Sequence, residues 1–590
     1  MFRRLLIANR GEIAVRIMRA CRDLGIESVA VYSDADAEAV HTRRADHAVR
    51  IGPASAADSY LSISAILAAA RESDCQAIHP GYGFLAENHL FAEACARERI
   101  AFVGPPADVI ARLGSKISAR QLAADAGIPV VPGATPADQT DATIAEAARR
   151  IGFPTLIKPS EGGGGIGMKA VRDEASLMDA IAQARREAVA AFGDGTLYLE
   201  RLIERPRHIE IQILADGHGH VVHLFERECS LQRRHQKVIE ESPSTALTPR
   251  LRARMGDAAV ALAREAGYES AGTVEFLLDG IGDEARFYFL EMNTRLQVEH
   301  PVTEETTGVD IVRTQIAIAA GEPLPWTQAE LAQRGHAIEA RVYAEDPERN
   351  DLPQAGPLVR YREPDMPGIR IDSGVAEGGA ISVHYDPMIA KLIATGDSRE
   401  TARLRAIAAL GQYEIEGIRT NIPLLVALLE HPRFVSGDID TNFIDRERAA
   451  LMASLATDPT ASAPEVDPWD ALRGWRLLQH PEDGRPPIVR RPGPTARVRG
   501  AASAASERPS TRGPADIDAL SSPMPATVSA IEVKPGDQVA AGDLLLTLEA
   551  MKMEMPIRSP RDGRVRAVNC QKGDLVQAGV PLVELDQPER

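Results

Sequence analysis

The pattern of apolar and polar positions in the first third of the chain is typical of a parallel α/β sheet. Short apolar runs that predict buried strands lie at residues 5–8, 28–32, 78 and 101–103. Amphipathic stretches separate them, and one places Ile13, Ile17 and Cys21 on a single helical face. This alternation predicts βαβ units, with Cys21 packed in the core.

Glycine clusters follow two of the apolar runs. Residues 81–83 come shortly after Ile78, and residues 162–167 come after the run 153–157. Open α/β sheets bind their ligands at the loops beyond the strand ends. We therefore expect both glycine clusters to belong to ligand-binding loops.

Residues 451–516 differ in composition from the rest of the chain, because they hold ten of its 40 prolines together with many Ala, Ser and Arg residues. Such a segment buries too little apolar surface to order itself fully, so we predict a tether. Within it, Trp469 and Trp475 are two of the three tryptophans of the chain. They indicate either a segment that docks a partner or a helix lying on a neighbouring domain.

The C-terminal part of the chain contains an internal repeat with a spacing of 37 residues. Residues 535–545 match residues 572–582, and Val528 and Val565 precede them in the same register. Both halves combine short apolar runs with Gly-Asp turns, which predicts a small pseudo-two-fold β-sandwich. The segment EAMKMEM joins the halves, so its Lys552 is expected at an exposed hairpin tip.

Composition and charge narrow the class of protein. A length of 590 residues predicts several domains, and 44% apolar with 26% charged residues excludes a wholly disordered or fibrous chain. Acidic residues outnumber basic ones by 84 to 67, and the net charge of −17 argues against a nucleic-acid partner. The five cysteines form no C-x-x-C pair, so neither a disulfide framework nor a thiolate zinc site is expected.

Targeting and membrane signals are also missing from the sequence. The N-terminal segment meets charge at Arg10 and Glu12, too early for the apolar core of a signal peptide. No run approaches the length of about 18 apolar residues that a membrane helix needs. We therefore expect a cytoplasmic protein without a membrane partner.

Lys552 lies between Met551 and Met553, and a further methionine follows at Met555. Methionines on an exposed turn are unfavourable unless another molecule recognises them. Together with the repeat, the A-M-K-M sequence resembles the biotinyl carrier domain, which implies biotin attached to Lys552. Lipoate and an unmodified lysine are the alternatives, although lipoyl domains carry a different pattern around their lysine. Ala526 stands where many carriers have glycine, a departure that concerns the start of a strand.

A polar row follows an apolar run that ends at Leu290. It consists of Glu291, Asn293, Arg295, Gln297 and Glu299. Residues two apart share one face of a strand, so these side chains could project into one site. Glu275, in another run with the same alternation, supplies a second carboxylate. Two carboxylates and an amide suit Mg²⁺ bound jointly with phosphate oxygens, whereas a half-solvated strand is the structural alternative.

Lys158 ends an apolar run and is followed by the glycine-rich segment 161–168, whose backbone can approach phosphates closely. A glycine-rich loop alone is a weak signal, and the sequence has no G-K-[ST] Walker element. Combined with the polar row, the loop is typical of ATP-grasp enzymes, and residues 1–450 resemble biotin carboxylase. The motifs that carry this resemblance lie at 79–88, 232–237 and 291–301.

The resemblance implies an α/β fold with several domains. The expected parts are a pre-ATP-grasp Rossmann-like domain (1–113), an ATP-grasp domain (114–330) with a mobile lid (about 130–203), a C-terminal α+β carboxylase domain (331–450), a Pro/Ala/Arg-rich linker with a possible docking segment (451–516) and an all-β biotinyl/lipoyl-type flattened barrel (517–590). Closure of the lid would exclude water that destroys a reactive intermediate.

The resemblance also implies roles in binding nucleotide and metal. The residues expected to contact ATP are Lys116, Lys158, Gly163, Gly164, Gly165, Glu200, Arg201, Ile203, His208, Gln232 and His235. The lysines would hold the phosphates, and Glu200 with the backbone near it would receive adenine. The histidines would contact ribose or phosphates, although isolated histidines are more often structural. The residues expected to bind Mg²⁺ or Mn²⁺ are Glu275, Glu291 and Asn293.

A second set of implied residues surrounds bicarbonate and biotin. It comprises Lys237, Arg295, Gln297, Val298, Tyr82 and Arg341. A guanidinium fork and an ammonium group suit a small planar anion. The implied catalytic residues are Arg295, Glu299, Lys237 and Arg341. Glu299 would be the general base on bicarbonate as it attacks the γ-phosphate to give carboxyphosphate, and Arg341 would stabilise the enolate of biotin.

Two positions in the glycine-rich segment depart from the family pattern. Glu161 stands where most relatives have glycine, and Ile166 stands where they have a basic residue. Glu161 adds negative charge beside a triphosphate and Ile166 removes a cation, so we hypothesise weaker ATP binding or altered lid closure. A carrier or scaffold with an inactive ATP site is the alternative, and the intact polar row argues against it.

As a whole, the sequence resembles the α subunit of a biotin-dependent acyl-CoA carboxylase. No segment offers the few hundred further residues of a carboxyltransferase, so a separate β subunit is the expected partner, together with biotin protein ligase and further copies of this chain. Acetyl-CoA and propionyl-CoA are the favoured acceptors, with butyryl- and methylcrotonyl-CoA still open. The carboxylating subunit of a pyruvate carboxylase is the enzymatic alternative, although in such split enzymes the carrier travels with the transferase chain.

Overall fold

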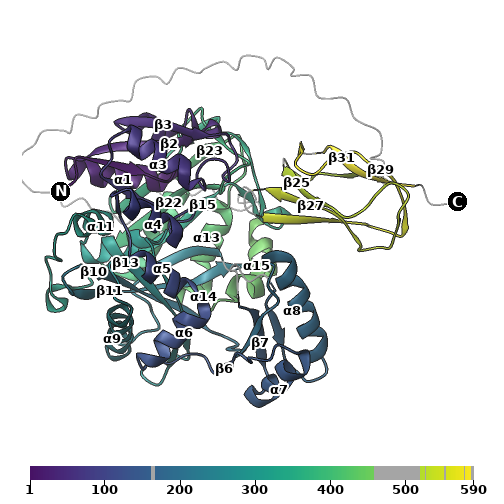
Figure 1. Ribbon diagram of the computed structural model, residues 1–590, viewed down its shortest axis with the longest axis horizontal. Coiled ribbons are helices and arrows are strands. Elements are labelled where there is room, and N and C mark those ends of the chain that lie inside the picture. Colours follow the sequence, from purple (N-terminus) through teal and green to yellow (C-terminus); the bar gives the residue numbers. More distant parts are fainter. Residues whose placement is uncertain are drawn as a thin grey trace, which may run out of the picture. The chain divides into compact units, whose positions relative to one another are not determined.

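The structure is a computed structural model that describes residues 1–160, 167–234, 236–456, 519–524, 526–550, 553–576 and 579–586. These residues form two compact units, one built on Met1–Leu455 and one that contains most of the residues described from 519 onward (Figure 1). Trp469 and Trp475, with most of the predicted tether, lie outside the described residues.

The N-terminal part of the first unit is the parallel α/β layer that the sequence predicted. Its strands are β1 (Arg4–Ile7), β2 (Glu27–Ser33), β3 (His47–Gly52), β4 (Ala77–His79) and β5 (Ala101–Phe102). They pair in parallel in the order β3-β2-β1-β4-β5. The accompanying helices are α1 (Gly11–Asp23), α2 (Val40–Arg44), α3 (Ile63–Glu72), α4 (His89–Arg97) and α5 (Ala107–Gly114). Cys21 is fully buried with Ile13 and Ile17, which confirms its predicted place in the core.

A small antiparallel sheet follows helix α6 (Lys116–Asp125). Its elements are β6 (Gly133–Ala134), α7 (Asp141–Ile151), β7 (Thr155–Pro159), β8 (Lys169–Val171), α8 (Leu177–Phe192) and β9 (Leu197–Arg201). The strands pair in the order β6-β9-β7-β8, and both helices bury apolar residues with them in a separate core. Because residues 133–201 have a hydrophobic core of their own, this segment can move as a rigid body.

A large antiparallel sheet forms the centre of the first unit. Its strands are β10 (Arg207–Ala215), β11 (Val221–Arg233), β12 (Gln236–Ser242), β13 (Ser270–Asp279), β14 (Arg286–Asn293), β15 (His336–Tyr343), β20 (Ile369–Ser373) and β22 (Met388–Gly396). Their order is β14-β13-β10-β11-β12-β15-β22-β20, so the sheet continues across the expected domain boundary at residue 330. The helices next to it in sequence are α9 (Pro249–Ala266), α10 (His300–Thr307), α11 (Ile311–Ala319) and α12 (Arg399–Leu410).

The remaining elements of the first unit are short. They are η1 (Asp34–Asp36), η2 (Gln328–Glu330), β16 (Glu345–Asp346), η3 (Pro347–Arg349), β17 (Leu352–Pro353), β18 (Gly356–Pro357), β19 (Arg360–Arg362), β21 (Ala380–Ile381), β23 (Glu414–Glu416), α13 (Ile422–Glu430), α14 (Pro432–Val435) and α15 (Phe443–Ala456). Helix α15 extends past residue 450, where the tether was expected to begin, because Leu451 is buried.

The prediction that Glu291 to Glu299 form one continuous strand was wrong. Strand β14 pairs with β13 only as far as Asn293, opposite Thr273. Beyond that point the Thr294 N–H donates to Glu87 Oε1 at 3.3 Å instead of to a strand. The chain then turns, and Glu299 becomes the N-cap residue of α10.

The second unit has the two-fold internal symmetry that the repeat predicted. Its strands are β24 (Ala519–Ser521), β25 (Ala526–Ile531), β26 (Gln538–Val539), β27 (Leu544–Ala550), β28 (Met553–Arg558), β29 (Gly563–Val568), β30 (Leu575–Val576) and β31 (Pro581–Leu585). One sheet has the order β24-β31-β29-β26 and the other β28-β27-β25-β30, so a shift of four strands converts one into the other. Val528 and Val565, equivalent in the repeat, are both buried.

Backbone hydrogen bonds obey the same symmetry. The Val528 N–H donates to Asp574 O at 2.9 Å, and the Val565 N–H donates to Asp537 O at 2.9 Å. Lys552 lies outside the described residues, between β27 and β28, which are neighbours in one sheet.

All five cysteines are buried free thiols. Among the helices of the described ranges, none combines the length and apolar character needed to cross a bilayer.

Candidate active site

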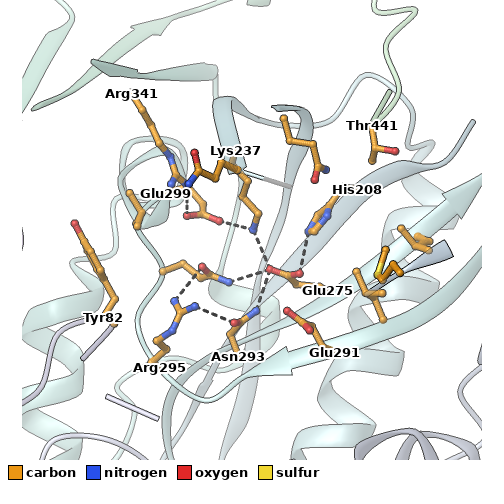
Figure 2. Close-up of a pocket in the computed structure, with 18 of the residues that line it drawn as sticks. Tyr82, His208, Lys237, Glu275, Glu291, Asn293, Arg295, Glu299, Arg341 and Thr441 are labelled. Atoms are coloured by element: carbon orange, nitrogen blue, oxygen red, sulfur yellow. Dashed lines mark hydrogen bonds and ion pairs between the residues drawn. The ribbon is translucent and has the colours of Figure 1, made fainter. Parts of the chain in front are cut away.

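Every described residue that the sequence singled out for binding or catalysis lines one cavity of about 840 Å³ in the first unit (Figure 2). These residues are Tyr82, Lys116, Lys158, Glu200, Arg201, Ile203, His208, Gln232, Lys237, Glu275, Glu291, Asn293, Arg295, Gln297, Val298, Glu299 and Arg341. The other predicted residues, which lie outside the described ranges, are Glu161, Gly163, Gly164, Gly165, Ile166, His235 and Lys552.

Strands β10, β13 and β14 place three glutamates in one row across the sheet. Glu210 lies opposite Glu275, and Glu275 lies opposite Glu291. Directly opposed side chains on neighbouring strands lie about 5 Å apart, so the carboxylates repel one another unless cations separate them. Desolvation and the charge of Glu275 raise the pKa of Glu291. The row is therefore a strong attractor for positive charge.

Lys237 supplies one of these cations. Its Nζ lies 2.5 Å from Glu210 Oε2, 2.9 Å from Glu275 Oε1 and 2.6 Å from Glu299 Oε1. Burial acts to lower the pKa of Lys237, but the three carboxylates outweigh it and raise that pKa well above its usual value. The ammonium group is consequently charged at neutral pH.

Glu299 lies between two cations from different strands. Arg341, on β15, donates from Nη2 to Glu299 Oε2 at 2.8 Å, on the opposite side from Lys237. Burial acts to raise the pKa of Glu299, but Lys237 and then Arg341 outweigh it and leave the pKa below its usual value. Glu299 is thus an ionised, fully buried carboxylate that can accept a proton.

Arg341 also holds a second carboxylate. Its Nε donates to Glu240 Oε1 at 2.6 Å. Burial, only partly offset by Arg341, raises the pKa of Glu240 to about 7. Arg341 is therefore fixed in orientation between Glu240 and Glu299, with its guanidinium at the cavity wall (Figure 2).

All three nitrogens of the Arg295 guanidinium group are held by neighbouring side chains. Its Nε lies 2.9 Å from Glu87 Oε2, and its two terminal nitrogens donate to Gln297 Oε1 at 3.2 Å and Asn293 Oδ1 at 3.0 Å. A planar guanidinium fixed in this way is prepared to bind a planar anion with little loss of side-chain entropy.

Glu275 and Glu291 are suitable ligands for a divalent cation. They are carboxylates on neighbouring strands, and Mg²⁺ is usually bound by one or two carboxylates together with substrate phosphates. The amide of Asn293 bridges Arg295 and Glu275, since its Nδ2 donates to Glu275 Oε1 at 2.9 Å. Asn293 therefore orients one carboxylate of the pair, and the donor set fits a magnesium ion.

His208 lies beside the same carboxylates. Its Nε2 is 3.1 Å from Glu275 Oε2. Burial acts to lower the pKa of His208, but Glu275 outweighs it and raises the pKa to about 9. At neutral pH His208 is consequently a cation, which suits contact with a phosphate.

The residues predicted to hold the nucleotide meet where the small sheet faces the large one. Lys158 on β7 forms an ion pair with Glu200 on β9, and Arg120 of α6 binds the other oxygen of Glu200. Lys116 begins α6, and Arg201 ends β9. The small sheet and α6 thus present cations along one side of the cavity, as phosphates require.

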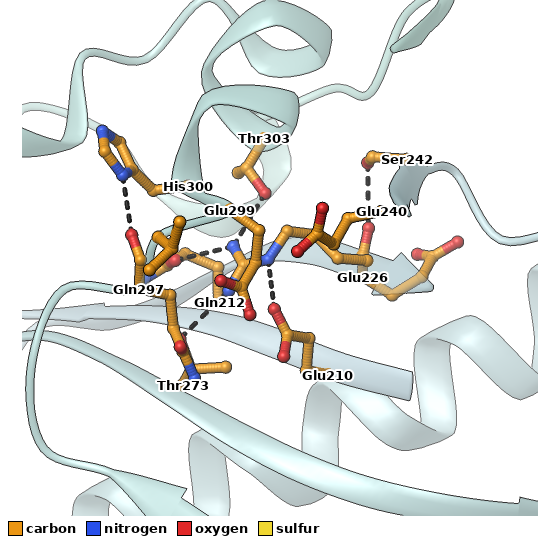
Figure 3. Close-up of polar contacts among 12 residues, drawn as sticks. Glu210, Gln212, Glu226, Glu240, Ser242, Thr273, Gln297, Glu299, His300 and Thr303 are labelled. Carbon is orange, nitrogen blue, oxygen red and sulfur yellow. Dashed lines mark hydrogen bonds and ion pairs between the residues drawn. The ribbon is translucent and has the colours of Figure 1, made fainter. Parts of the chain in front are cut away.

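Several residues of the site had been given no role from the sequence. Arg227, which is fully buried, binds Glu210 and donates to Gln212 Oε1 at 2.8 Å and Thr273 Oγ1 at 3.1 Å. Figure 3 shows Glu210, Gln212 and Thr273 around Glu299. Glu210 follows His208 by two residues on one strand, so alternation along β10 could have revealed it. Arg227, on β11, gave no comparable signal.

Family models match nearly the whole of the first unit and also the second. The N-terminal domain of biotin carboxylase matches residues 1–110, and its C-terminal domain matches residues 339–446. Between them, the ATP binding domain of the carbamoyl-phosphate synthase L chain matches residues 115–327. A model described as biotin-requiring enzyme matches residues 518–585.

Two curated relatives align along the full chain. The mitochondrial methylcrotonoyl-CoA carboxylase subunit alpha of Mus musculus is 39% identical over 672 residues, which cover 99% of this chain and 93% of the relative. The propionyl-CoA carboxylase alpha chain of Ruegeria pomeroyi is 39% identical over 684 residues, covering 99% of this chain and 100% of the relative. Both alignments are longer than the chain, so each relative has residues without a counterpart here.

A solved structure agrees with the architecture of the first unit. The biotin carboxylase domain of the Hydrogenobacter thermophilus 2-oxoglutarate carboxylase, crystallised with MgADP, ADP and bicarbonate, is 45% identical, with a TM-score of 0.73. The match covers 76% of this chain and 99% of that one. The first unit therefore has the ATP-grasp fold of biotin carboxylase. The chain belongs to the family of biotin-dependent acyl-CoA carboxylase α subunits, which join a biotin carboxylase to a biotin carrier domain.

Proposed function

We propose that this chain carboxylates biotin attached to its own Lys552 and passes the carboxyl group to a separate carboxyltransferase β subunit, which carboxylates a short-chain acyl-CoA. The observation that carries the proposal is Glu299, an ionised carboxylate between Lys237 and Arg341, beside the fixed guanidinium of Arg295. This arrangement offers a base, an anion site and a stabilising cation in one cavity.

In the first step, Arg295, Gln297, Lys237 and the Val298 N–H bind bicarbonate. Glu299 removes its proton, and the oxygen so activated attacks the γ-phosphorus of ATP. The bond to the β-phosphate oxygen breaks, which gives carboxyphosphate and ADP. The ionised state and fixed position of Glu299 support its role as the base.

Cations around the nucleotide stabilise the charge of this transition state. Lys116, Lys158 and His208 contact the phosphates, and Glu275 with Glu291 would hold Mg²⁺, which supplies electrophilic stabilisation of the phosphate oxygens. Carboxyphosphate would then break into CO₂ and phosphate. The phosphate would take the proton of a ureido nitrogen of biotin, and that nitrogen would accept the CO₂. Tyr82 and Arg341 would line its binding site, where Arg341 neutralises developing negative charge.

The domain content and the named relatives support the choice of partner and acyl-CoA. The relatives aligned over the whole chain are named methylcrotonoyl-CoA and propionyl-CoA carboxylase subunits, which supports a branched or unbranched short acyl chain. Propionyl-CoA is our first choice, with acetyl-CoA next. Biotin protein ligase would attach the cofactor, and copies of this chain would assemble with the β subunit.

Two measurements test the proposal. The purified chain should hydrolyse ATP in a bicarbonate-dependent manner with free biotin as acceptor, and an inactive scaffold would not. Co-purification with the β subunit, followed by assay of a panel of acyl-CoA thioesters, would then identify the acceptor. Activity with pyruvate in place of every thioester would favour the pyruvate carboxylase alternative.

A further inference from the structure

Two buried side chains hold the carbonyl groups of Gln297 and Val298. The Gln297 carbonyl shares its peptide group with the Val298 N–H, and the Val298 carbonyl shares its peptide group with the Glu299 N–H. His300 Nδ1 lies 2.7 Å from the Gln297 carbonyl oxygen (Figure 3). Lys391 Nζ lies 2.9 Å from the Val298 carbonyl oxygen. His300 and Lys391 are themselves fully buried. The peptide groups on the two sides of Val298 are therefore fixed at the same time.

These bonds determine where the backbone donor points. In a trans peptide the N–H is directed opposite to the C=O of the same group. Because the Gln297 carbonyl turns toward His300, the N–H of Val298 turns to the other side, and Val298 lines the cavity. Lys391 fixes the following peptide group, which also sets the backbone position of Glu299.

The state of each side chain suits this task. A carbonyl oxygen only accepts, so His300 Nδ1 carries the hydrogen. Burial lowers the pKa of His300 well below its usual value, which keeps the ring neutral. Lys391 Nζ lies 3.1 Å from Glu12 Oε1, the same oxygen that accepts the Tyr82 hydroxyl. Its charge is thus balanced within the protein, and one chain of contacts links Tyr82 to the Val298 carbonyl.

We infer that His300 and Lys391 are positioning residues that aim the Val298 N–H at bicarbonate. The inference rests on the proposed function, which places bicarbonate against Val298. Neither side chain contacts the anion. Each acts through the backbone, so its loss should weaken bicarbonate binding far more than nucleotide binding.

A pair of variants at His300 separates positioning from packing. His300→Phe keeps a planar ring and removes the donor, whereas His300→Asn keeps an N–H close to the place of Nδ1. Steady-state kinetics of the full chain with free biotin should show the bicarbonate KM raised about tenfold in His300→Phe, with the ATP KM within about twofold. His300→Asn should return the bicarbonate KM to within about threefold of the wild-type value. Equal effects of both variants, or a parallel rise in both constants, would overturn the inference.

Variants of Lys391 test the inference independently of His300 and separate a positioning role from a loss of fold stability. Lys391→Met leaves Glu12 without its cation, which should lower the melting temperature. The double variant Lys391→Met, Glu12→Gln removes the unpaired charge, while Gln still accepts the Tyr82 hydroxyl. We expect its melting temperature to recover and its bicarbonate KM to stay raised. If the melting temperature and the bicarbonate KM of the double variant both returned to the wild-type values, Lys391 would only stabilise the fold.

Arg295→Lys distinguishes failure of the inference from failure of the proposed function. If Arg295→Lys leaves the bicarbonate KM unchanged, the proposed bicarbonate site is wrong. If Arg295→Lys raises it and His300→Phe does not, only the positioning role is wrong.

Discussion

Lys237 Nζ lies 2.6 Å from Glu299 Oε1, and two further carboxylates, Glu210 and Glu275, contact the same ammonium group. The base of the proposed reaction is therefore held by a cation that also faces the metal-binding row. Bicarbonate that binds here competes with a carboxylate for Lys237, which couples anion binding to the state of Glu299.

Replacement of the base should abolish turnover without unfolding the protein. Glu299→Gln keeps the size of the side chain, and its single amide oxygen can still accept a hydrogen bond from either Lys237 or Arg341, which bind opposite oxygens of Glu299. Because the amide cannot take a proton, kcat for bicarbonate-dependent ATP hydrolysis should fall by about 10²- to 10⁴-fold. The ATP KM, measured in the same assay, should change little. A variant that retains more than about a tenth of the wild-type kcat would exclude Glu299 as the base.

Arg341→Ala should be far more damaging than removal of an arginine from the surface. A cation aimed at developing charge commonly contributes about 3 kcal/mol to the barrier, so biotin carboxylation should slow by about 10²-fold or more. Arg250, exposed at the start of α9, is the matched control, and Arg250→Ala should leave the rate unchanged. Similar rates for the two variants in the free-biotin assay would contradict the role of Arg341.

The raised pKa of His208 predicts a pH-dependent stability. The folded protein holds the imidazolium proton to a pKa of about 9, against 6.5 for an ordinary histidine. The protonated His208 therefore adds at most about 3 kcal/mol to the free energy of unfolding. This stabilisation is complete below pH 6.5 and disappears as the pH rises through about 9. Melting temperatures of wild type and His208→Gln should differ at about pH 6 and converge toward about pH 9.5. A difference that is constant over this range would show that His208 is not charged.

The two departures in the glycine-rich segment predict a change in nucleotide affinity. The double variant Glu161→Gly, Ile166→Arg removes a negative charge and adds a cation near the triphosphate, so the ATP KM should fall. The bicarbonate KM serves as the internal control and should not change. An ATP KM equal to that of the wild type would dispose of the hypothesis.

Much of the fold and site could be predicted from local sequence patterns. The repeat around Val528 and Val565 fixed the symmetry of the second unit, because equivalent residues build equivalent strands. Glu275 and Glu291 could be paired because each lies in an alternating run. The path of the chain from Glu291 to Glu299 could not be predicted, since the strand ends where Glu87, distant in sequence, takes the Thr294 N–H.

The buried charged residues that support the site could not be predicted from sequence patterns either. Arg227 and Lys391 are fully buried charges whose partners come from other segments of the chain. A charged residue in a strand is ordinarily read as solvent-facing, and only the pairing of strands shows that it is enclosed.

The central claim is that one polypeptide both activates bicarbonate and carries the biotin that receives it. The most direct test is to incubate the biotinylated full chain with MgATP and radiolabelled bicarbonate, without the β subunit, and to locate the label by peptide mapping. Our account predicts ATP-dependent label on the peptide that contains Lys552, and none in Lys552→Arg or Glu299→Gln. Label that is independent of Lys552, or a fully biotinylated chain that takes up none, would contradict it.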